Sequence, residues 1–139
     1  MTGIAAVLDT SALLGYARGQ VAVGELIAEI SDERRQVGVP AACLAQARAA
    51  VPDDLGAAHL MLLTTTPTVV VLPLGPDETG RADPVWQVGR LARAAGGDLG
   101  LGHAIRAALA HEAYYATTEP HRVKDILPAG WDVLDLGAG

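Results

Sequence analysis

Short apolar runs alternate along this chain with longer stretches in which apolar residues recur every three or four positions. The runs are short and rich in β-branched residues, which is typical of strands, whereas the longer spacing is typical of helices. The predicted strands lie at about 4–8, 37–39, 69–72, 114–118 and 131–136. The predicted helices lie at about 11–17, 20–31, 41–50, 53–63, 84–95 and from an Asp98 cap to His111, with a short helix from Pro120.

Strands that alternate with helices in this way predict a parallel sheet covered by helices on both faces, a three-layer α/β/α sandwich. The run Val69–Leu72 is continuous and β-branched, and we predict that it forms a central strand. A length of 139 residues fits one domain, expected over 1–136, with a loose tail at 137–139.

The composition indicates the cellular location that we expect for the protein. Half of the residues are hydrophobic, yet no apolar run has the length of a membrane span, and no secretory signal pattern opens the chain. A single cysteine, Cys43, excludes an internal disulfide and a zinc site built on cysteines. We therefore expect a cytoplasmic protein that does not enter membranes.

The net charge of −6 argues against a strongly basic nucleic-acid binder. It leaves room for a nuclease, in which acids gather around metal ions while arginines follow the substrate backbone. Only five aromatic residues are present and none is phenylalanine, so stacking platforms for single strands are scarce.

The first predicted strand ends abruptly in an acid, Asp9, followed by Thr10 and Ser11. Open parallel sheets place ligands at the carboxyl ends of their strands, so a carboxylate there suits a divalent metal or a phosphate site. The alternative is that one of these residues caps the helix that begins at about Ala12, because Asp, Ser and Thr are preferred N-caps.

Another acid, Glu119, follows a later strand after Thr117 and Thr118, and the fold class brings it to the same edge as Asp9. Clustered carboxylates repel each other unless a cation binds, and oxygen ligands select hard ions such as Mg or Mn. Alternatively, Glu119 is an acid at the start of the short helix from Pro120, where the helix dipole favours a negative charge. Asp98 is by default a helix cap and alternatively a third ligand.

Three motifs in this order resemble the PIN-domain proteins, the nuclease fold of VapC-type toxins, over about residues 3–136. The first is the strand end and helix start Leu8–Leu14 (LDTSALL). The second is Val39–Ala47, where the family usually carries a strand followed by a glutamate-bearing helix. The third is the late helix and strand from Gly102 to Pro120, ending in TTEP where the family has a Thr-x-Asp pattern.

The resemblance implies three or four acids that bind Mg or Mn, and this chain matches them in part. Asp9 matches the first acid, Gln46 stands in place of the second, and Glu119 replaces the usual aspartate of the fourth. The third falls on Leu101, and Asp98, one helical turn earlier, is the candidate substitute.

The implied activity is metal-dependent hydrolysis of an RNA phosphodiester, weak or altered, by a protein that acts as the toxin of a toxin–antitoxin pair. The resemblance also implies a homodimer and an antitoxin partner, which the apolar run Leu60–Leu63 supports unless that run is simply a buried helix. The predicted catalytic and metal residues are Asp9, Asp98 and Glu119, supported by Thr10, Ser11, Gln46 and Thr117, with Arg18, Arg48 and Arg106 as candidate RNA contacts or ordinary surface arginines.

Two other hypotheses stay open. A PIN-like protein could bind RNA or a protein partner without cleaving, because Gln46 is neutral and a poor metal ligand. A phosphatase-like fold could use Asp9 as its nucleophile, but that chemistry usually has a second aspartate two residues on, where this chain has Ser11.

Overall fold

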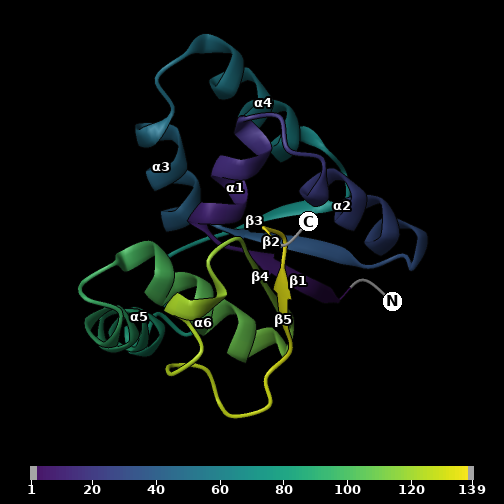
Figure 1. The fold of residues 1–139 in the computed structure, drawn as a ribbon. Helices are drawn as coiled ribbons and strands as arrows, with labels where there is room; N and C mark the ends of the chain where they lie inside the picture. Colours follow the sequence, from purple (N-terminus) through teal and green to yellow (C-terminus); the bar gives the residue numbers. More distant parts are fainter. Residues whose placement is uncertain (1–2, 138–139) are drawn as a thin grey trace.

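The computed structural model describes residues 3–137, and its centre is a five-stranded parallel sheet with the order β3-β2-β1-β4-β5 (Figure 1). The strands are β1 (Ile4–Leu8), β2 (Gln36–Pro40), β3 (Val69–Leu72), β4 (Tyr114–Thr117) and β5 (Val133–Asp135). In the middle of the sheet, Val7 lies opposite Gly38 on one side and Tyr115 on the other.

Helices cover both faces of this sheet, α1 to α4 on one face and α5 and α6 on the other (Figure 1). Their bounds are α1 (Thr10–Ala17), α2 (Ala22–Asp32), α3 (Ala41–Ala50), α4 (Asp54–Thr65), α5 (Asp83–Ala94) and α6 (Leu99–His111), with a 3₁₀ turn η1 (Pro120–Arg122) after β4. The predicted three-layer α/β/α sandwich is therefore confirmed. Over residues 3–137, no helix is long and apolar enough to cross a membrane.

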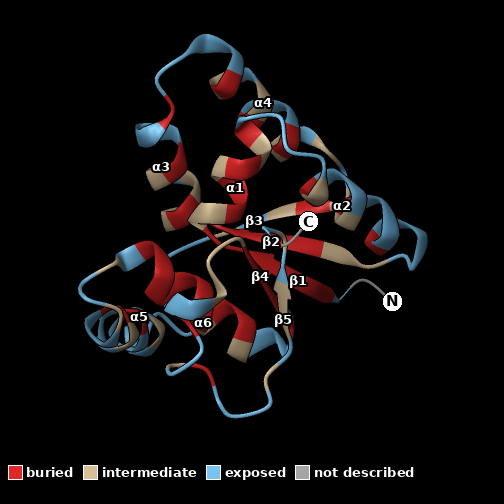
Figure 2. Cartoon of the chain, viewed as in Figure 1, coloured by how far each residue is buried: buried red, intermediate tan, exposed pale blue. Residues whose placement is uncertain are grey.

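The core lies around β1, all five residues of which are buried. Figure 2 shows the burial concentrated on the sheet and on the helix faces turned toward it. Leu8, Leu13 and Ile105 are among the fully buried large side chains, from the strand and from a helix on each face. A strand buried on both faces explains why the N-terminal run is continuously apolar rather than alternating.

The run Val69–Leu72 forms β3 at the edge of the sheet, so the prediction of a central strand is wrong. β3 pairs with β2 on one side, and Val71 is exposed while Val70 and Leu72 are half-buried. β-Branched residues favour any pleated surface, and three valines in a row do not distinguish an edge strand from an inner one.

The strand order reverses between β1 and β4. From β1 the chain proceeds outward through β2 and β3, and then crosses to the other side of β1 to form β4 and β5. Such a reversal opens a crevice beyond the carboxyl ends of the two strands concerned, where open α/β sheets bind ligands. In the predicted loose tail, Gly137 donates its N–H to Asp135 Oδ1, and 138–139 lie outside the described residues.

Candidate active site

Asp9 leaves the carboxyl end of β1 and is only 2% exposed. Its Oδ1 accepts the N–H of Ala12 at 3.0 Å and the hydroxyl of Ser11 at 2.6 Å, and its Oδ2 accepts the hydroxyl of Tyr115 at 3.1 Å. The capping interpretation is thus confirmed, because Asp9 is the N-cap of α1. The carboxylate is buried among three neutral donors, which is how a protein stabilises a charge without a counter-ion.

A relay of hydroxyl groups joins the start of α1 to the end of β4. Ser11 Oγ lies 3.0 Å from Thr117 Oγ1 and accepts the N–H of Thr118, while Thr117 Oγ1 accepts the N–H of Glu119. Since Ser11 uses its only hydroxyl proton on Asp9, Thr117 is the donor to Ser11. The two hydroxyls therefore fix the loop that carries Glu119 relative to Asp9.

Gln46, from α3, bridges the first helix to the last. Its Oε1 accepts the hydroxyl of Thr10 at 2.9 Å, and its Nε2 donates to Asp98 Oδ1 at 3.2 Å. An ionised glutamate at this position could accept from Thr10 but could not donate to Asp98, and the two carboxylates would repel. The amide of Gln46 can therefore accept from Thr10 and donate to Asp98 at the same time, which an ionised glutamate could not do.

The close approach of these helices depends on Gly100 in the first turn of α6. A Cβ there would collide with the side-chain amide of Gln46 and lie 2.9 Å from Thr10 Oγ1. The carbonyl of Gly100 also accepts the thiol of buried Cys43 at 3.0 Å. Burial raises the pKa of Cys43 from 9.0 to about 12, so this thiol is a packing group rather than a nucleophile.

Asp98 is the N-cap of α6, and its Oδ1 accepts the N–H of Leu101 at 3.0 Å. Its other oxygen lies 3.1 Å from Nη2 of Arg122, whose Nη1 lies 3.8 Å from Glu119 Oε1. Burial by itself would raise the pKa of Asp98, but hydrogen bonds from Leu101, Gln46 and Arg122 outweigh burial and lower it. Asp98 is therefore held in its charged form.

The structure brings most of the predicted site residues into this one network at the carboxyl edge of the sheet. Its members are Asp9, Thr10, Ser11, Gln46, Asp98, Thr117 and Glu119. Two further members were missed in the sequence, Tyr115 and Arg122. Arg122 follows Glu119 by three residues, a spacing that suggests a local ion pair, but nothing local points to Asp98 as its other partner.

The three predicted RNA contacts do not converge on this network. Arg18 caps the end of α1, and Arg48 lies in α3 beside a hollow shared with α4. Arg106 donates its Nε–H to Gln87 on α5. Within residues 3–137, none of the three forms a hydrogen bond or ion pair with a member of the network, so their common role as RNA contacts stays a prediction.

Two other predicted positions are now placed. Leu101 is buried in the core, so an acid introduced there would replace a core side chain rather than join the network. His103 is buried and its Nδ1 accepts the N–H of Ala42 at 3.3 Å, which confirms that it is a packed, hydrogen-bonded histidine.

The donor set fits one divalent cation in part. Asp98 and Glu119 both contact the guanidinium of Arg122, through different nitrogens at 3.1 and 3.8 Å, so the two carboxylates lie around one cationic group. Asp9 directs its oxygens to Ser11, Ala12 and Tyr115 instead. Within residues 3–137, no three His, Cys, Asp or Glu side chains are grouped to hold an ion together. The residues thus suit a two-carboxylate, single-ion site and do not suit a two-ion site.

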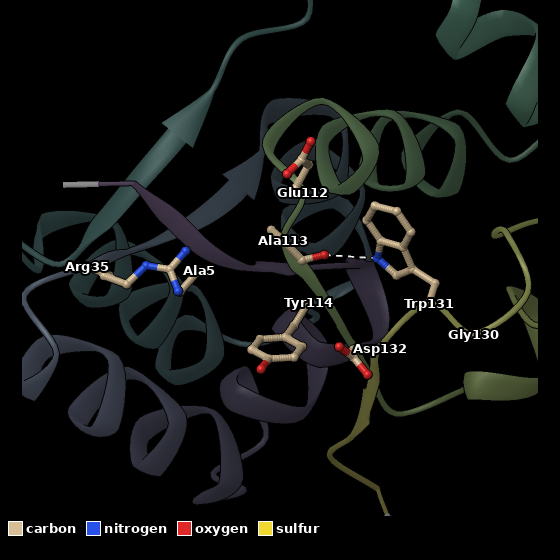
Figure 3. A pocket seen from close by; sticks show the side chains of 8 residues that line it. All are labelled: Ala5, Arg35, Glu112, Ala113, Tyr114, Gly130, Trp131 and Asp132. Carbon is tan, nitrogen blue, oxygen red and sulfur yellow. Dashed lines mark hydrogen bonds between the residues drawn. The ribbon is translucent and has the colours of Figure 1, made fainter. Parts of the chain in front are cut away.

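A separate hollow of about 450 Å³ lies at the amino-terminal edge of the sheet, the end opposite Asp9 and Glu119. Figure 3 shows Arg35, Tyr114 and Asp132 around it, with the indole of Trp131 donating to the carbonyl of Ala113 at 2.9 Å. None of its lining residues belongs to the acidic network.

Searched against protein-family models and against curated proteins, the chain matches none of them. The resemblance to PIN-domain proteins therefore stays a prediction from the sequence motifs.

Proposed function

We propose that this chain is a PIN-like, Mg- or Mn-dependent endoribonuclease of weak or altered activity. The observation that carries the proposal is that Asp98 and Glu119, from different segments of the chain, contact one guanidinium, and that hydroxyl groups link buried Asp9 to the loop that carries Glu119. They meet where the strand order reverses between β1 and β4, the place at which this class of fold binds ligands.

Asp98 and Glu119 would hold the ion, because their carboxylates already share a cation. The ion, when bound, supplies an activated water and stabilises the charge that develops on the phosphate. Asp9 shapes the site through its cap, and the hydroxyls of Ser11 and Thr117 orient the loop that carries Glu119. Thr10 and Gln46 orient Asp98 in the same way from the other side.

A second candidate function is a PIN-like protein that binds RNA or a protein partner without cleaving RNA. Two observations favour it. Gln46 is neutral where the family has an acid, and Arg122 already neutralises part of the charge on Asp98 and Glu119. Each feature reduces the attraction of the site for a divalent ion.

The partners follow from the same proposal: RNA as substrate, and, for a toxin of this type, a homodimer and an antitoxin. Of the run Leu60–Leu63, the first and last residues are buried in the core and the middle pair, Met61 and Leu62, are exposed on α4. Leu60 and Leu63 therefore pack into the core, while Met61 and Leu62 form a small apolar surface that supports a protein contact there.

The test is Mn²⁺-dependent cleavage of a labelled RNA by the purified protein and by Glu119→Gln and Asp98→Asn. We expect cleavage that needs Mn²⁺, that both substitutions abolish and that Glu33→Gln, a matched change of an exposed acid at the end of α2, leaves intact. RNA binding without cleavage would favour the second candidate. Cleavage that survives both substitutions would overturn the assignment of the site.

A further inference from the structure

Arg122 lies between the two acids to which the proposed function assigns the metal ion. Its guanidinium lies between Asp98, at the start of α6, and Glu119, at the end of β4, with contacts of 3.1 and 3.8 Å. Over residues 3–137, both ion pairs within 4 Å belong to this one side chain. The chain has ten lysines and arginines in all, so pairing with acids is a property of this position rather than of the surface in general.

The segment that carries Arg122 lets it act on both acids. η1 is a single 3₁₀ turn directly after the site loop, and it puts Arg122 three residues from Glu119. Asp98, by contrast, is fixed from behind by the N–H of Leu101 and the amide of Gln46. The scaffold therefore holds the Asp98 carboxylate and the backbone of Glu119, while the cation sits on the end of a long side chain.

The ion pairs are open to solvent. The side chains of Arg122, Asp98 and Glu119 are 37%, 23% and 45% exposed. Ion pairs at such exposure are weak, because water screens the attraction and the long side chain loses rotamer freedom. A divalent ion, with twice the charge, can displace the guanidinium without unfolding any element.

We propose that Arg122 is an internal cation that occupies the metal position of this site and competes with a divalent ion for Asp98 and Glu119. The inference rests on the proposed function and deepens it, because it assigns to one residue the control of metal affinity. The resting site is closed by its own guanidinium, and metal binding requires Arg122 to swing out into solvent.

A change in metal affinity follows directly. Metal binding must first displace Arg122 from its two ion pairs, which are weak at this exposure. Removing the guanidinium with Arg122→Gln should therefore tighten Mn²⁺ binding by about twofold to fivefold. Arg122→Lys keeps the charge but loses the two-pronged contact, and its Kd should stay between those of the wild type and Arg122→Gln.

The experiment is calorimetric titration of Mn²⁺ into the wild type, Arg122→Gln and Arg122→Lys. Arg90→Gln is the matched control, because it removes the same charge from an exposed position on α5. We expect Arg90→Gln to bind Mn²⁺ as the wild type does. The melting temperature of each variant, with and without Mn²⁺, gives a second readout that does not depend on RNA cleavage.

The outcomes separate this inference from the proposed function. Equal Kd values for the wild type and Arg122→Gln would overturn the inference and leave the function standing. Tighter binding by Arg122→Gln with no Mn²⁺-dependent RNA cleavage in either protein would support the inference and overturn the function. No Mn²⁺ binding by any variant would overturn both.

Discussion

The hydrogen bond from Tyr115 to Asp9 gives the sharpest prediction, since both of its ends are buried. Tyr115→Phe removes the hydroxyl that lies 3.1 Å from Asp9 Oδ2 and leaves that oxygen without its donor. Hydrogen bonds to charged groups contribute about 1.5–3 kcal/mol, and a buried charge left without a partner costs at least as much. We therefore expect Tyr115→Phe to lower the free energy of unfolding by about 2 kcal/mol.

Urea denaturation followed by circular dichroism measures this loss. With an m-value of about 2 kcal/mol per M, the midpoint should fall by about 1 M urea. Tyr114→Phe is the matched control, because Tyr114 precedes Tyr115 in β4 and is 43% exposed. Its hydroxyl makes no hydrogen bond to any residue in the described part of the chain, and the change should stay within about 0.5 kcal/mol.

The result that would refute this reasoning is a Tyr115→Phe midpoint equal to that of Tyr114→Phe. Asp9 would then obtain a replacement donor at no cost, and the buried network would not be what fixes it at the end of β1. Burial, together with the charge of Asp9, raises the pKa of Tyr115, so the hydroxyl keeps its proton over the whole working range of the assay.

Three further predictions concern packing and pH. The thiol of Cys43 keeps its proton to about pH 12 in the folded protein but only to about pH 9 in the unfolded chain. Between these values the unfolded state binds fewer protons, so the free energy of unfolding should fall by up to about 1.4 kcal/mol per pH unit. Urea titrations at pH 8 to 11 measure this fall. Burial lowers the pKa of His103, so below about pH 6.5 the unfolded state binds a proton more readily than the native state does. The free energy of unfolding should therefore decrease as the pH falls, which melting temperatures from pH 7.5 to 5 would measure. Gly102→Ala should destabilise by about 1–3 kcal/mol in urea, because its Cβ would come within 2.5 Å of the carbonyl of Val88, whereas Gly89→Ala, with open space around its Cβ, should stabilise by up to about 1 kcal/mol.

Controls for the two pH predictions come from matched variants. In Cys43→Ala the alkaline fall in stability should become shallower by the slope assigned to the thiol, and an unchanged slope would contradict that assignment. His103→Gln should flatten the acid limb while His111→Gln, at the exposed end of α6, should not. Equal effects of the two histidine variants would contradict the role given to His103.

The sequence was a sufficient guide to the elements because the spacing of apolar residues reflects which face is buried. The helix from Asp98 and the strand ending at Leu8 follow from that spacing and from their caps alone. The position of Val69–Leu72 at the edge did not follow, because the order of strands depends on crossovers that periodicity does not encode.

The candidate site was predictable to the same extent. Parallel strands bring their carboxyl ends to one edge, which was enough to place Asp9 and Glu119 together. The orientation of each carboxylate was not predictable, because it depends on donors from elsewhere in the chain, such as Tyr115 for Asp9 and Arg122 for Asp98. A sequence motif identifies which acids approach one another but not which of their oxygens remain free.

The pairing of β1 with β4 also determines when during folding the acidic edge comes into existence. Asp9 takes two donors from its neighbours Ser11 and Ala12, but its third donor, the hydroxyl of Tyr115, lies 106 positions later, and β4 begins only at Tyr114. Parallel pairings between segments so distant form late, because a long loop must close before any contact stabilises it. During synthesis Asp9 therefore emerges from the ribosome long before Tyr115 does, and its Oδ2 lacks this donor until nearly the whole chain is available. The network at this edge forms only in a completed fold, so any measurement of it doubles as a measurement of whether folding has finished.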